Sequence, residues 1–102
     1  MADYVKVAKS GDIAPGHGKA VEVNGQKIAV LNCDNSFHAI EDTCPHKGGP
    51  LSEGTISDGS VRCPWHGAIF VIETGEPVSG PAPCAVKVYP CRVSGDDIEI
   101  QA

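Results

Sequence analysis

Two short segments of the sequence contain side chains that commonly bind transition metals. The first, TCPHKGG, contains Cys44 and His46, and the second, RCPWHGA, contains Cys63 and His66. Thiolate and neutral imidazole both bind zinc, copper and iron, and two ligands from each segment make a set of four. A single Cys or His in a small domain is usually a core or surface residue, but four in two matched segments indicate a metal site.

The division of ligands between the segments bears on which metal they bind. Structural zinc usually takes a Cys pair from one element and a His pair or second Cys pair from another, whereas each segment here supplies one Cys and one His. A [2Fe-2S] cluster with two cysteines on one iron and two histidines on the other fits this division. A zinc-stapled binding module without a redox role is the remaining alternative.

Longer stretches around these residues resemble the Rieske-type ferredoxins. CPHKGGPLSEG (44–54) and CPWHGAIF (63–70) match the two cluster-binding boxes of that family, and TGEPVSGPAP with VKVYPCRV resembles the segments that follow them. The resemblance implies that Cys44 and Cys63 bind a buried iron, while His46 and His66 bind an outer iron near the surface. It also implies that Gly80–Pro83 is a proline loop that covers the cluster.

Three positions differ from the high-potential Rieske proteins of respiratory complexes. Those proteins carry a disulfide between the two boxes and a serine that donates to a sulfide, and Gly49, Trp65 and Ala68 stand at the corresponding places here. Fewer hydrogen bonds leave the reduced cluster less stabilised. The resemblance therefore predicts a potential at the low end of the Rieske range, on the order of -150 mV.

Short alternating apolar runs separated by turn signals predict an all-β protein. Asn24-Gly25 can adopt the positive φ angles of a type I′ turn, which predicts a hairpin over 21–30. Further strands are expected at 37–41, near 60–63, near 68–72, at 85–93, and, after a break at Ser94–Asp97, around Ile98 and Ile100. No helix is indicated.

Regular β pattern flanks a middle region that is rich in Gly and Pro. We therefore expect one domain over residues 1–102, with an antiparallel β base and an inserted, loop-rich cluster-binding subdomain over about 42–83. The resemblance implies the same architecture, the Rieske fold with three antiparallel sheets.

The composition excludes several classes of protein. No apolar run approaches the roughly 20 residues that a membrane-spanning helix needs, and MADYVKVAKSGD is neither a signal nor a transit peptide, so we expect a cytoplasmic protein without a membrane partner. A net charge of -5 with scattered bases argues against a nucleic-acid surface.

Residues 41–80 hold six acids against Lys47 and Arg62. This acidity is either a solvated surface or a field that steers docking to a basic partner.

The other cysteines and histidines lack a partner at ligand spacing. Cys84 and Cys91 flank one predicted strand that would hold them roughly 23 Å apart, too far for a disulfide. We expect these two and Cys33 to be free, buried, inert thiols, and His17 and His38 not to bind metal. Trp65 lies between two expected ligands and either shields the site or forms part of a docking surface.

No nucleotide-binding or hydrolase motif is present, and the chain leaves little room for a substrate pocket. The resemblance implies a one-electron carrier between an NAD(P)H-dependent flavoprotein reductase and a terminal ring-hydroxylating oxygenase, with transient docking near His46 and His66. It would be an electron-transfer component without catalytic residues. The alternative is the small subunit of an assimilatory nitrite reductase, which the boxes also resemble.

Overall fold

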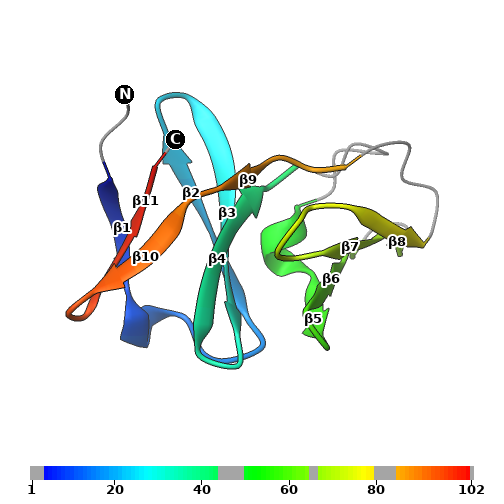
Figure 1. The fold of residues 1–102 in the computed structure, drawn as a ribbon, viewed down its shortest axis with the longest axis horizontal. Helices are drawn as coiled ribbons and strands as arrows, with labels where there is room; N and C mark the ends of the chain where they lie inside the picture. Colours follow the sequence, from blue (N-terminus) through cyan, green and yellow to red (C-terminus); the bar gives the residue numbers. More distant parts are fainter. Residues whose placement is uncertain (1–3, 44–49, 65–66, 80–84, 102) are drawn as a thin grey trace.

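The computed structural model describes residues 4–43, 50–64, 67–79 and 85–101, which form three antiparallel sheets (Figure 1). The first has the strand order β1-β11-β10, with β1 at Val5–Lys9, β11 at Asp97–Ile100 and β10 at Cys91–Ser94. The second has the order β2-β3-β4-β9, with bounds Gly18–Val23, Gln26–Cys33, Ser36–Glu41 and Val88–Tyr89. The third has the order β5-β6-β7-β8, with bounds Thr55–Ser57, Ser60–Arg62, Ile69–Val71 and Pro77–Ser79. The all-β prediction is confirmed.

The third sheet lies to one side of the other two, and falls within the 42–83 segment that the sequence sets apart (Figure 1). Two single turns of 3-10 helix, η1 at Ser10–Asp12 and η2 at Leu51–Glu53, are the helices of the described ranges. Neither is long enough to cross a membrane.

The central hairpin forms where the sequence predicts it. Asn24 and Gly25 have φ angles of 51° and 78°, and Val23 pairs with Gln26 on either side of the turn. Strand β3 is buried from Ile28 to Asn32. The buried Asn32 amide is satisfied, since its Nδ2 donates to the carbonyl of Ile13 and its Oδ1 accepts from the Asn35 amide, both at 2.7 Å. β3 pairs with β2 on one side and β4 on the other. It is therefore an interior strand of the second sheet.

The single strand expected over 85–93 is wrong. The chain forms β9 in the second sheet and β10 in the first, and Pro90 lies between them. Proline has no amide hydrogen to continue a ladder, so it suits the point where a strand leaves one sheet for another. The strand that was expected to separate Cys84 from Cys91 is therefore not continuous, and Cys84 lies outside the described residues.

Alternation along the third sheet separates an inner face from an outer one. Val61 and Phe70 are buried in one hydrophobic cluster, and the half-buried Ile56 packs against it. The same cluster includes Ala29, Leu31 and Ile40 of the second sheet. A shared core thus holds the third sheet on the second. The first and second sheets together are called the base below.

Gly18 lies where the base meets η2. A Cβ built at this position would lie 2.6 Å from Cδ2 of Leu31 and 2.7 Å from the carbonyl oxygen of Ser52. Contacts this short require a shift of backbone or of a buried side chain. The missing side chain therefore allows η2 to lie directly on β2.

We predict that Gly18→Ala lowers the free energy of unfolding by about 1–3 kcal/mol, because the added methyl overpacks this junction. Gly11→Ala is the matched control, since a Cβ there has nothing within 4 Å. Urea unfolding followed by far-ultraviolet circular dichroism measures both. Equal effects of the two substitutions would show that the close approach at Gly18 has no energetic importance.

Candidate metal centre

The segment that contains the first expected ligand pair is anchored at both ends. Thr43 and Pro50 form an antiparallel bridge, and the amide of Leu51 donates to the carbonyl of Asp42 at 2.7 Å. The Asp42 carboxylate accepts the amide of Ser52, also at 2.7 Å. Backbone pairing and one buried carboxylate therefore fix the two positions from which this segment starts and ends.

Asp42 was counted among the acids of an exposed region, and the structure corrects this. Only 7% of its surface is exposed, and it caps the amide of the equally buried Ser52. Sequence reasoning missed this role because the partner amide lies ten residues away. The available signal was the position of an acid at the boundary between a strand and a Gly- and Pro-rich segment.

The second segment is the loop of the β6–β7 hairpin. Arg62 pairs with Ile69, the Cys63 amide donates to the Ala68 carbonyl at 2.7 Å, and the Gly67 amide donates to the Cys63 carbonyl at 3.1 Å. Gly67 has a φ of 76°, which an L side chain rarely adopts. Pro64 follows Cys63 in the turn, and its ring restricts φ at this position.

Both segments end on the same hydrophobic cluster. Leu51, which follows the first, shares this cluster with Cys63 and Ala68 of the second. Gly54 tightens the contact, because a Cβ at this position would collide with the carbonyl of Arg62. The core therefore places the ends of the two segments near each other, as convergence on one site requires.

Cys63 fits the role of a buried thiolate ligand. It is 1% exposed, in a loop whose backbone is closed by hydrogen bonds on both sides of the residue. Cysteine sulfur is the usual protein ligand of iron in iron-sulfur clusters. Its donor type and burial suit the inner iron of a [2Fe-2S] cluster.

The other expected ligands, Cys44, His46 and His66, lie outside the described residues. So do Gly48, Gly49, Trp65 and the Gly80–Pro83 segment. Among the residues that are described, no three His, Cys, Asp or Glu side chains form a group that could hold a metal ion. The four-ligand set therefore remains a prediction, and no competing site is found in the described ranges.

The described thiols away from the loops are not bonded to each other. Cys33 and Cys91 are free and half-buried, less buried than the sequence analysis expected. Burial raises the pKa of Cys91 to about 11, so this residue is a neutral thiol at physiological pH. His17 is exposed and His38 half-buried. Neither belongs to a metal-binding group within the described part of the chain.

Comparison with known families decides between zinc and iron-sulfur. The sequence profile of the Rieske [2Fe-2S] domain matches residues 3–90. The chain belongs to the Rieske [2Fe-2S] family. The resemblance seen in the two boxes is therefore confirmed, and the cofactor of this Rieske domain is a [2Fe-2S] cluster rather than zinc.

Curated relatives of the Rieske domain include both short and long proteins. The chain is 38% identical over 97 residues to the biphenyl dioxygenase ferredoxin subunit of Pseudomonas sp. (strain KKS102), which covers 93% of this chain and 88% of that protein. It is 35% identical over 91 residues to apoptosis-inducing factor 3 of Mus musculus, which covers 89% of this chain. The chain spans only 15% of the length of that second relative.

Solved structures confirm the Rieske fold. The ferredoxin of carbazole 1,9a-dioxygenase from Nocardioides aromaticivorans IC177 aligns with a TM-score of 0.91 and 28% identity over 98% of both chains. A putative NADH-dependent nitrite reductase small subunit from Mycobacterium tuberculosis aligns with a TM-score of 0.91 over 100% of this chain and 96% of that chain, but at 24% identity. At that identity the second likeness shows the fold alone.

We predict that Asp42→Ala lowers the free energy of unfolding by about 1–3 kcal/mol, because it leaves the buried Ser52 amide without an acceptor. Asp42→Asn keeps an oxygen at this position and should lose less than half as much. Glu53→Ala, at an exposed neighbouring acid, is the control. Urea unfolding of the three variants measures these differences. If Asp42→Ala behaved like Glu53→Ala, the carboxylate would not hold this segment.

Proposed function

We propose that this chain is a one-electron carrier, in which Cys44, His46, Cys63 and His66 hold the [2Fe-2S] cluster. The observation that carries this proposal is that the described ends of both loops, Leu51 of the first and Cys63 and Ala68 of the second, pack in one hydrophobic cluster, in which Cys63 is 1% exposed. When bound, the cluster supplies a one-electron redox couple at this place. The proposal includes a single domain over 1–102, with about 42–83 as its cluster-binding subdomain.

The protein residues around the site limit access and hold its geometry. Leu51, Ala68 and Phe70 are fully buried in the same hydrophobic cluster as Cys63. These side chains therefore keep water from the buried side of the proposed metal site. The hydrogen bonds of Cys63 and Gly67 hold the described ends of the second loop together. A preorganised site of this kind changes little between oxidation states, which favours rapid electron transfer.

The partners that we propose are an NAD(P)H-dependent flavoprotein reductase and a terminal ring-hydroxylating oxygenase. Support comes from relatives that are ferredoxin components of dioxygenases. It also comes from a solved complex of reduced oxygenase and oxidised ferredoxin in carbazole 1,9a-dioxygenase, to which the chain is similar at 32% identity and a TM-score of 0.89. Docking is transient and occurs near His46 and His66, in the cytoplasm. The chain itself has no catalytic residues, and the oxygenase carries out the chemistry on substrate.

No observation favours the nitrite reductase alternative over this one, because the likeness to those small subunits rests on the fold. The two functions differ in how the chain associates. A mobile carrier leaves its partner between electron transfers, whereas a subunit copurifies with the large chain.

The test is electron delivery by the purified protein. We expect one reversible one-electron wave below zero in a redox titration, and rapid reoxidation of the reduced protein by a terminal oxygenase in stopped-flow absorbance. Expression in the native cell should yield the chain free of a large subunit. A potential well above zero, or a stable complex with a sirohaem-containing chain, would overturn this function.

A further inference from the structure

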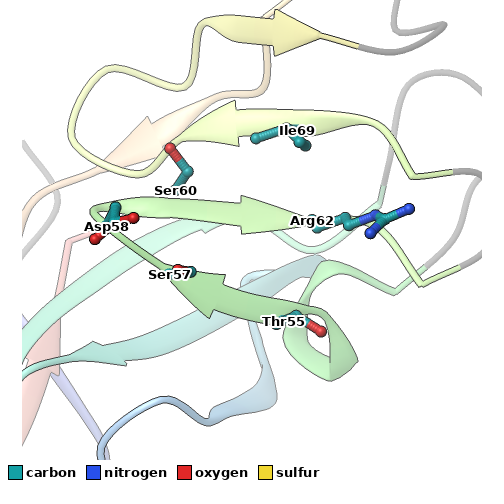
Figure 2. Close-up of a pocket in the computed structure, with 6 residues that line it drawn as sticks. All are labelled: Thr55, Ser57, Asp58, Ser60, Arg62 and Ile69. Carbon is teal, nitrogen blue, oxygen red and sulfur yellow. The ribbon is translucent and has the colours of Figure 1, made fainter.

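The outer face of the third sheet carries one basic side chain beside the metal-binding loop. In β6 the buried Val61 alternates with Ser60 and Arg62, which face outward. Cross-strand pairing puts Arg62 between Thr55 and Ile69. Figure 2 shows Arg62 at the end of β6 nearest the loop and Asp58 at the opposite end, in the β5–β6 turn.

The guanidinium of Arg62 lies against the loop itself. Its Nη2 and Nε atoms are 3.2 Å and 3.3 Å from the position that a Cβ on Gly67 would occupy. Gly67 is hydrogen-bonded to Cys63, and Arg62 is the residue before Cys63. The side chain therefore places a permanent positive charge at the edge of the proposed electron-transfer site.

This charge contrasts with its surroundings. Within residues 50–64 and 67–79, Arg62 is the only basic side chain, and the acids in these ranges are Glu53, Asp58, Glu73 and Glu76. Arg62 makes no ion pair with another described residue. The exposed guanidinium is thus available to an acidic group from outside the chain.

The form of the surface favours a protein over a small molecule. A depression of about 380 Å³ is lined by Thr55, Ser57, Asp58, Ser60, Arg62 and Ile69. Each of these is exposed or half-exposed. Small-molecule sites bury most of the ligand, which a shallow sheet face cannot do. The depression instead combines side-chain hydroxyl groups, the Arg62 cation and the half-buried Ile69. Such a mixture is typical of the rim of a transient protein interface.

We propose that the outer face of β5–β6–β7 is a docking surface for a redox partner protein, which presents a carboxylate to Arg62 and a basic side chain to Asp58 at the other end of the depression. This inference rests on the proposed carrier function and names the chemistry of its partner. Arg62 acts as a positioning residue, because its charge orients the partner with the metal-binding loop at the contact.

The test uses two proteins of opposite surface charge as electron acceptors, an acidic cytochrome b5 and a basic cytochrome c. Second-order rates of their reduction are measured by stopped flow at low ionic strength, with the reduction potential of each variant. For Arg62→Gln we expect about a threefold slower reaction with the acidic acceptor and a faster one with the basic acceptor. Arg62→Lys should retain most of the wild-type rates. Both differences should vanish near 0.5 M salt, where the Debye length is about 4 Å.

Lys19→Gln is the matched control, because Lys19 is exposed on β2 of the base and forms no ion pair with other described residues. It removes the same charge and should change both rates by less than about 1.5-fold. If Arg62→Gln acted only by changing the driving force, its rates with the two acceptors would move in the same direction. That result would overturn the docking surface, and so would rates for Arg62→Gln that do not differ from those of Lys19→Gln. If the wild-type protein reduced neither cytochrome, the carrier function would fail, and this inference with it.

Discussion

The rest of the structure depends on one constraint, which is that the described ends of two loops are fixed on one apolar core. A site built from two segments exists only if the ends of both are fixed relative to each other. The Thr43–Pro50 bridge closes the first segment, and the Cys63–Ala68 hydrogen bond closes the second. Leu51 and Cys63 then meet in the same hydrophobic cluster. Packing and backbone pairing therefore set the positions of the loop ends.

The base contributes to the core on which the loop ends pack. Its central strand β3 is buried and contributes Ala29 and Leu31 to the cluster under the loops. Gly18 permits η2 to lie on β2. The Asp42 carboxylate holds η2 in place by accepting a hydrogen bond from the Ser52 amide. Buried, hydrogen-bonded support of this kind suits the proposed carrier function, because reorganisation of the site would slow each transfer. Contact with the proposed partner is left to the surface, where Arg62 and Asp58 line one depression.

Local features of the fold could be predicted from the sequence, and non-local ones could not. The turn at Asn24-Gly25 depends only on the φ angles that these residues accept, and it was predicted correctly. The sheet change at Pro90 depends on which strands are near in space, so a continuous apolar pattern concealed it. Burial of Asp42 likewise depends on a distant amide. Residue types and spacing identified the family, whereas the assignment of Cys44, His46 and His66 as ligands remains a prediction.

The most direct test of the account is the Mössbauer spectrum of the oxidised protein enriched in ⁵⁷Fe, together with iron, zinc and acid-labile sulfide analysis. Two cysteines on one iron and two histidines on the other require two iron environments in equal amounts, with as much sulfide as iron. A single iron environment would contradict the assignment of both cysteines to one iron and both histidines to the other. Zinc in place of iron, without sulfide, would contradict the metal centre itself.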